Sequence, residues 1–246
     1  MKHPDNTEQR EIICIPMVPL HNEVVPAHMS GMTKVLGGHV QHMVFVLDMS
    51  GSMSRAWSGV VAAYNQYLQR RRHSQSECDL VSVVQFDSST QVAVDMLPIS
   101  QAPSELPYRG GGTKFLPAAN SAFTLASKTP STHTPVVVFM SDGEANDAHD
   151  ATEKFSELNR NIHQSHADDL ELHVIAFRGG ASTTQLQQIA GSSRNGKLHT
   201  SADTAELSDI FVEIAGGADV AVQLEAEIGK RISDAVSDKL SVEYLG

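Results

Sequence analysis

Strand-like and helix-like segments alternate along residues 42–216, and no other feature of the sequence constrains the fold as strongly. Strand-like runs occur at residues 43–47, 80–86, 91–96, 135–140, 172–177 and 197–200, and those at 43–47 and 135–140 are continuously apolar, as is typical of buried strands. Stretches with apolar residues at helical spacing lie between most of them. Because parallel neighbours in a sheet need a crossover connection, this alternation predicts a mostly parallel sheet with helices on both faces.

One pair of strand-like runs departs from the alternation. Residues 80–86 and 91–96 are separated only by the four-residue segment 87–90, which suits a hairpin and is too short for a crossover helix. We therefore expect a doubly wound, Rossmann-like α/β fold. Its sheet would have six strands, mostly parallel, with one antiparallel edge strand.

The helical segments carry apolar stripes and, in three places, start signals. Capping-box pairs, Asp150 with Glu153, Ser182 with Gln185 and Asp203 with Glu206, predict where three of the helices begin. The last of these helices would end before Gly216.

The two ends of the chain lie outside this pattern. Residues 1–41 form an N-terminal extension that would add a strand, wrap the domain or belong to an interface. Residues 42–217 form the α/β domain. Residues 218–246 have an apolar residue at nearly every fourth position, which predicts an amphipathic helix. That helix would either dock on its own domain or be displayed to a partner, including a second copy of the chain.

Charge and cysteine content limit the classes of function. A formal net charge of −11 argues against nucleic-acid binding, and the single basic run, residues 70–73, falls where cations stabilise the end of a helix. Cys14 and Cys78 have no CxxC spacing, so neither a disulfide framework nor a thiol zinc site is expected. The apolar stretch at residues 12–20 contains two prolines and is too short to span a bilayer. We expect a cytoplasmic protein without membrane insertion.

Oxygen-bearing side chains gather where the first apolar run ends. Asp48, Ser50 and Ser52 would lie at the carboxyl end of a parallel strand, the edge at which open α/β sheets bind ligands. A carboxylate and two hydroxyls are hard donors that suit Mg²⁺. These residue types are also favoured helix caps, so the three alone leave a metal site and a cap open.

Two further loops carry donors of the same kind. Thr113 follows three consecutive glycines, and Asp142 follows the apolar run at residues 135–140. The three loops would meet if the first and fourth strands were neighbours where the strand order reverses. Two carboxylates would neutralise a divalent cation, and hydroxyls with water would complete an octahedron. The segment 110–114 lacks the spacing of a phosphate-binding loop, so nucleotide binding is not favoured.

At these residues the chain resembles the von Willebrand factor type A (vWA) domain family. Residues 48–52, Asp-Met-Ser-Gly-Ser, match its DxSxS motif, Gly112-Thr113 its isolated threonine, and Ser141-Asp142-Gly143 its second aspartate loop. The match covers residues 42–216.

The resemblance implies a metal-ion-dependent adhesion site (MIDAS). Its ligands, some through water, would be Asp48, Ser50, Ser52, Thr113 and Asp142. The metal would be Mg²⁺, with Mn²⁺ or Ca²⁺ as substitutes, and an open coordination position would accept an Asp or Glu of a partner protein. The resemblance further implies that the helix at residues 203–215 shifts when a ligand binds.

The expected function is therefore a Mg²⁺-dependent protein-interaction module that is not an enzyme. One alternative is a phosphotransferase of the haloacid dehalogenase type, whose nucleophile is also an Asp at the end of the first strand. That family needs a second Asp two residues later, where this chain has Ser50, and Lys114 is only a distant candidate for its lysine. Another alternative is a metal-independent scaffold that acts through residues 218–246.

Overall fold

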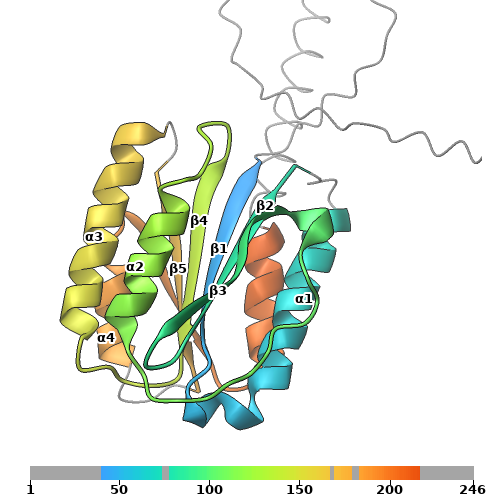
Figure 1. The fold of residues 1–246 in the computed structure, drawn as a ribbon, viewed down its shortest axis with the longest axis vertical. Helices are drawn as coiled ribbons and strands as arrows, with labels where there is room; N and C mark the ends of the chain where they lie inside the picture. Colours follow the sequence, from blue (N-terminus) through green and yellow to red (C-terminus); the bar gives the residue numbers. More distant parts are fainter. Residues whose placement is uncertain (1–39, 74–77, 167–168, 179–182, 217–246) are drawn as a thin grey trace, which may run out of the picture. The chain divides into compact units, whose positions relative to one another are not determined.

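The computed structural model describes residues 40–73, 78–166, 169–178 and 183–216. Within these residues, six strands form one sheet in the order β3-β2-β1-β4-β5-β6 (Figure 1). The strands are β1 (Gln41–Asp48), β2 (Leu80–Phe86), β3 (Thr90–Pro98), β4 (Thr134–Ser141), β5 (Glu171–Phe177) and β6 (Asn195–Ser201). The helices are η1 (Gly51–Arg55), α1 (Trp57–His73), η2 (Ile99–Gln101), α2 (Phe115–Ala126), α3 (Ala148–Ser165) and α4 (Thr183–Ala190), and residues 204–216 are also helical.

Strand β1 lies at the centre of the sheet and is parallel to both of its neighbours, β2 and β4. Strands β5 and β6 continue the parallel arrangement on one side, while β3 pairs with β2 in the antiparallel direction at the other edge. The expected doubly wound sheet with one antiparallel edge strand is confirmed. The first and fourth strands are neighbours, as the proposed meeting of the three loops requires.

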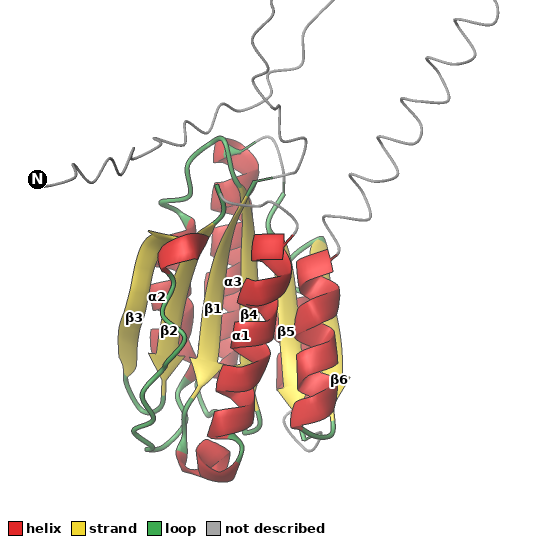
Figure 2. Ribbon diagram, turned by 90° about the vertical axis from the view of Figure 1, so that its right-hand side faces the viewer, coloured by secondary structure: helices red, strands yellow, loops and turns green. Residues whose placement is uncertain are grey.

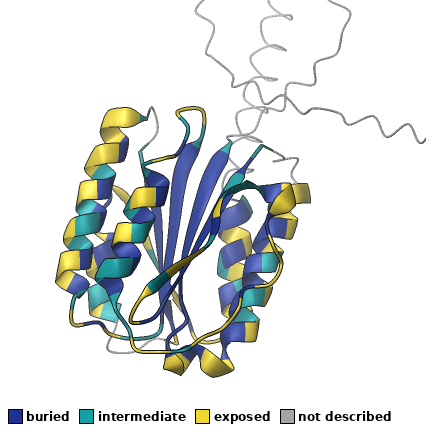
Figure 3. Ribbon diagram, in the orientation of Figure 1, coloured by how far each residue is buried: buried dark blue, intermediate teal, exposed yellow. Residues whose placement is uncertain are grey.

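Helices cover both faces of the sheet, as Figures 1 and 2 show. Helix α1 and residues 204–216 pack on one face, and helices α2, α3 and α4 pack on the other. Alternate residues of β1 point into the two cores, with Phe45 on the α1 side and Val44 on the α2 side. Every residue of β1 and β4 is buried (Figure 3), which explains why their sequences are nearly continuous apolar runs.

The basic run at the end of α1 has a structural role. Arg71 is 1% exposed, and its Nη2 lies 2.7 Å from Oδ2 of the buried Asp79. Arg72 donates hydrogen bonds from Nε and Nη2 to the carbonyl oxygen of Ile99. These side chains join α1 to the start of β2 and to the segment after β3.

Some expectations concern residues outside this description. The extension at residues 1–41, apart from its last two residues, and the helix at 218–246 lie outside the described residues, and so does Cys14. Cys78 is disulfide-bonded, so the expectation of cysteines without disulfides is wrong. Within the described ranges, no helix is long and apolar enough to cross a membrane.

Candidate metal site

The five predicted ligand residues lie on three loops at one edge of the sheet. Asp48 is the last residue of β1, and Ser50 and Ser52 follow it at and within η1. Asp142 directly follows β4, and Thr113 lies two residues before α2. Because β1 and β4 are adjacent and parallel, their carboxyl ends place Asp48 and Asp142 in neighbouring loops.

A chain of hydrogen bonds joins four of these residues. Asp48 Oδ1 accepts from the backbone N–H of Ser50 at 2.8 Å, and the hydroxyls of Ser50 and Ser52 lie 3.1 Å apart. The Ser52 hydroxyl donates to Asp142 Oδ1 at 2.7 Å. The two carboxylates are therefore linked through the two serines.

Thr113 joins the group from the third loop. A methyl group placed at the Cα of Gly143 would lie 3.6 Å from Thr113 Oγ1, so the hydroxyl lies close to the turn that carries Asp142. The structure thus brings all five predicted side chains to one place. They are the hard oxygen donors that suit Mg²⁺.

Asp48 is the most buried carboxylate of the group, with no exposed surface. Burial raises its pKa, and the negative charge of Asp142 raises it further, while hydrogen bonds from Ser141 and Ser50 lower it in part. The Ser141 hydroxyl donates to Asp48 Oδ2 at 2.5 Å. Two carboxylates thus share a partly desolvated edge of the sheet, and a divalent cation would offset the repulsion between their negative charges.

The five candidate ligand residues include no cysteine or histidine. Among the described residues, no group of three His, Cys, Asp or Glu side chains gathers where it could hold a metal. The candidate site is thus two carboxylates and three hydroxyls, without the thiolates or imidazoles of a structural zinc site.

Two of the three consecutive glycines let the backbone approach Asp87 and Ser88 of the β2–β3 connection. A Cβ on Gly111 would lie 2.8 Å from Asp87 Oδ2, and one on Gly112 would lie 2.7 Å from Ser88 Oγ. Gly111 also has a φ of +147°, which disfavours other residues.

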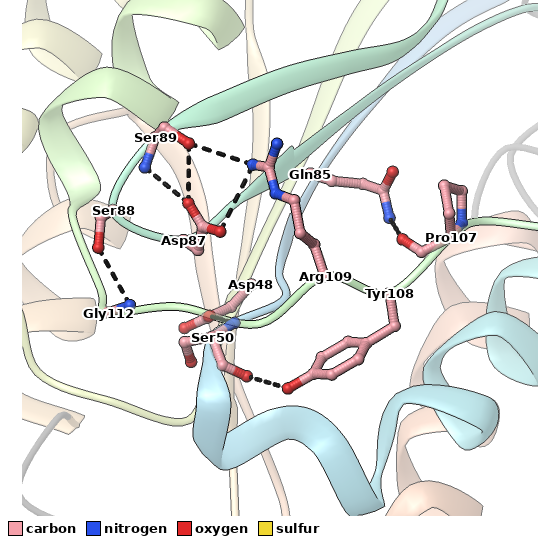
Figure 4. Close-up of polar contacts among 10 residues, drawn as sticks. All are labelled: Asp48, Ser50, Gln85, Asp87, Ser88, Ser89, Pro107, Tyr108, Arg109 and Gly112. Atoms are coloured by element: carbon pink, nitrogen blue, oxygen red, sulfur yellow. Dashed lines mark hydrogen bonds and ion pairs between the residues drawn. The ribbon is translucent and has the colours of Figure 1, made fainter.

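Several supporting residues were not predicted as part of the site. The Tyr108 hydroxyl donates to the carbonyl oxygen of Ser50 at 2.9 Å (Figure 4). Asp147 accepts hydrogen bonds from the backbone N–H groups of Phe115 and Leu116, so it caps the start of α2, two residues after Thr113. Gln185 of α4 bonds both backbone groups of Ala145. No local sequence signal marks these contacts, because each joins segments more than thirty residues apart.

Comparison with known proteins identifies the family of this chain and solved structures with a similar fold. The model of the von Willebrand factor type A domain family matches residues 42–213. No curated protein matches the chain.

Three of the similar solved structures are a pilus adhesin, a bacterial vWA protein and a mussel protein. The pilus adhesin SpaC from Lactobacillus rhamnosus GG is 11% identical with a TM-score of 0.61, and the match covers 73% of this chain and 30% of the adhesin. A von Willebrand factor type A protein from Catenulispora acidiphila is 15% identical with a TM-score of 0.52, covering 72% and 42%. Proximal thread matrix protein 1 from the mussel byssus, with a zinc-occupied MIDAS motif, is 16% identical with a TM-score of 0.57, covering 73% and 46%.

These structural similarities show the fold alone, because the identities are low. This chain also spans less than half the length of each of the three proteins.

Proposed function

Because the chain belongs to the von Willebrand factor type A domain family, we propose that it is a protein-interaction module that depends on a bound Mg²⁺. Domains of this family are typically interaction or adhesion modules and are generally not enzymes. The partner would be a protein that presents an Asp or Glu side chain to the metal. Asp48, Ser50, Ser52, Thr113 and Asp142 would hold the metal, some of them through water.

One observation carries this proposal. The hydrogen-bond chain from Asp48 through Ser50 and Ser52 to Asp142 links two carboxylates on neighbouring strands, with the Thr113 turn beside them. A divalent cation would balance the charge of two such carboxylates when both are ionised. A bound cation would supply a large local positive charge at the site and a coordination position that a partner's carboxylate could fill.

The choice of Mg²⁺ rests on donor chemistry. Mg²⁺ takes one or two carboxylates and keeps several waters, which matches two aspartates with hydroxyls. Mn²⁺ and Ca²⁺ prefer oxygen donors too and are expected to substitute. The mussel-byssus protein holds zinc in its MIDAS motif, so zinc belongs among the metals tested.

Calorimetric titration with Mg²⁺ tests the metal site. Asp142→Ala removes one of the two carboxylates and is expected to abolish the binding heat. Asp95→Ala is the matched control, because Asp95 is an exposed acid on β3 whose carboxylate lies 3.6 Å from Lys128 Nζ. The control should bind Mg²⁺ as the unmodified chain does. Equal heats for all three proteins would reject the metal site.

Capture of partners from native lysate tests the interaction itself. The immobilised chain is exposed to lysate in Mg²⁺ and, separately, in EDTA. Proteins retained only in Mg²⁺, and lost with Asp48→Ala, are the expected result. An identical set of retained proteins in EDTA would contradict a metal-dependent module.

The two other functions considered above are not favoured. A phosphotransferase would need a second aspartate where the structure has Ser50, whose hydroxyl is bonded to Ser52. A scaffold acting through residues 218–246 concerns a segment outside the described residues. Location in the cytoplasm stays a prediction, and the disulfide at Cys78 removes one observation on which it was based.

A further inference from the structure

The loop at residues 107–112, which we call the rim loop, is fixed beside the candidate metal site by contacts at nearly every residue. Gln85 donates to the Pro107 carbonyl at 2.7 Å, and the Gly111 carbonyl accepts from the Gly51 N–H at 2.9 Å. Gly112 N–H donates to Ser88 Oγ at 3.0 Å (Figure 4). A loop held in this way binds a partner without a large cost in ordering.

Tyr108 places an exposed aromatic ring at this rim. Its side chain is one of three exposed large hydrophobic groups among the described residues, with Val92 and Val212. Only Tyr108 of these three contacts a candidate ligand residue, through its hydrogen bond to the Ser50 carbonyl. The ring also packs on Trp57, with centroids 5.8 Å apart. If a partner's acidic residue binds at the metal, an apolar side chain next to that residue could pack on the Tyr108 ring.

Arg109 places a cation next to that ring. Its side chain is 50% exposed, and its contacts with Ser89 Oγ (3.1 Å) and Asp87 Oδ2 (3.4 Å) both use Nη2. Among the described residues, Nε and Nη1 have no hydrogen-bond partner, so part of the guanidinium remains available. The carboxylate of Asp87 is bonded also by the N–H and hydroxyl of Ser89, which spreads its charge over several donors.

The net charge of the whole chain gives the positive charge of Arg109 a role in partner binding. At a formal net charge of −11, the surface as a whole repels acidic proteins. A partner that brings a carboxylate to the site must overcome that repulsion, and an exposed arginine beside the site offsets it. Tyrosine and arginine are also the residue types that most often dominate binding energy at interfaces.

We propose that Tyr108 and Arg109 select the partner by the residues that flank its metal-binding acid. The partner segment then carries an apolar side chain that packs on Tyr108 and a second acidic residue that pairs with Arg109. This inference rests on the proposed function, because it presumes that the first acidic residue binds at the metal.

Selection from a displayed peptide library tests the proposal. Each peptide has one fixed Asp with random residues on both sides, is captured in Mg²⁺ and is eluted with EDTA. The unmodified chain should enrich an acidic residue and an apolar residue at fixed positions beside the Asp. Arg109→Glu should replace the acidic preference by a basic one while keeping the apolar preference.

Matched variants separate selectivity from general damage. Lys128→Glu makes the same change of charge at 51% exposure beyond the far end of α2, and it should leave the enriched sequences unchanged. Tyr108→Ala should weaken an enriched peptide by about tenfold, whereas Tyr108→Phe keeps the ring and should stay within about twofold. Calorimetry with Mg²⁺ should give the same affinity for Arg109→Glu and Lys128→Glu as for the unmodified chain.

The outcomes distinguish failure of the metal-dependent interaction from failure of partner selection by Tyr108 and Arg109. Failure of the unmodified chain to yield any EDTA-eluted peptides would reject the proposed function, and this inference with it. EDTA-eluted peptides with the same flanking residues for the unmodified chain and Arg109→Glu would overturn this inference alone. Loss of Mg²⁺ affinity in Arg109→Glu would also overturn it, because the residue would then act on the metal site and not on the partner.

Discussion

At the scale of single residues, the carboxylate of Asp48 combines full burial with a second carboxylate nearby. Burial raises its pKa and Asp142 adds to the effect, so the ionised form is disfavoured while no cation is bound. Asp48→Asn removes the charge but keeps an oxygen to accept from the Ser50 N–H. We expect this variant to unfold a few degrees higher than the unmodified chain in EDTA, for a gain of about 1 kcal/mol.

The same substitution should remove the response to metal. Mg²⁺ at a hundredfold excess over its dissociation constant stabilises a folded protein by about 2.7 kcal/mol, which thermal unfolding detects readily. The unmodified chain should show this rise and Asp48→Asn should not. Asp95→Asn, an exposed control, should respond fully to Mg²⁺. An undiminished rise in Asp48→Asn would show that Asp48 is not a ligand.

Arg71 makes a second prediction at this scale. Its guanidinium and the Asp79 carboxylate form a buried ion pair, and the same carboxylate accepts from the N–H of Gln41 at the start of β1. Arg71→Met would remove the guanidinium that pairs with this buried carboxylate, and the loss of one member of a buried ion pair costs about 3–5 kcal/mol. Denaturant unfolding should therefore show a large loss of stability.

A double variant identifies the source of that loss. Asp79→Asn added to Arg71→Met removes the buried charge that Arg71 balances and should recover part of the stability. Equal losses in the single and double variants would attribute the effect to packing instead.

At the scale of helices and strands, the positions of most strands and helices could be predicted from the sequence, whereas the contacts between distant segments could not. The four inner strands, β2, β1, β4 and β5, were recognisable because buried strands are local apolar runs. Asp48 and Asp142 were recognisable because each directly follows such a run. The capping box at Asp150 was wrong: α3 begins at Ala148 after Asp147, so Asp150 lies within the first turn. The carboxylate of Asp147 caps α2 instead, and no local pattern could reveal a contact made across thirty residues.

Gly59 shows another contact that only the fold reveals. Helix α1 approaches the start of the helix at residues 204–216 so closely that a Cβ on Gly59 would overlap the Thr204 side chain. Because one overlapping atom is the Thr204 Cβ, a rotamer change cannot relieve the overlap. Gly59→Ala should destabilise the domain by about 1–3 kcal/mol of overpacking, which exceeds the gain in helix propensity of roughly 1 kcal/mol.

The neighbouring residue provides the control for this prediction. Ser58 is exposed in the same turn of α1, so Ser58→Ala should be neutral or slightly stabilising. Thr204→Gly combined with Gly59→Ala should restore part of the lost stability. A Gly59→Ala variant at least as stable as the unmodified chain would mean that the two helices are free to move apart.

At the scale of the whole molecule, three histidines make the fold sensitive to acid: His42 in β1, His133 just before β4 and His199 in β6. Burial is the main cause that lowers the pKa of His42, His133 and His199, and for His42 the value falls from 6.5 to about 4. The His42 ring is fully buried, with its nitrogens bonded to the hydroxyls of Thr129 and Ser82. A charged ring in that position would lose solvation without gaining a carboxylate in contact.

The sign of the effect follows from which state binds protons. Below pH 6.5 the unfolded chain protonates these histidines while the folded chain resists, so stability is lost as the pH falls from 6.5 towards 4. For His42 alone, a difference of about 2.5 pH units corresponds to roughly 3 kcal/mol. The raised pKa of Asp48 acts in the opposite direction, because the folded state takes up that proton more readily.

Denaturant unfolding at a series of pH values between 7.5 and 4 would measure this loss. We expect a steady fall in the free energy of unfolding below pH 6.5, with a clearly smaller slope in His42→Asn, which cannot be protonated. His149→Asn is the control: His149 is 84% exposed, so its replacement should leave the slope unchanged. If His42→Asn lost stability with the same slope as the unmodified chain, burial of His42 would not be the source of the acid sensitivity.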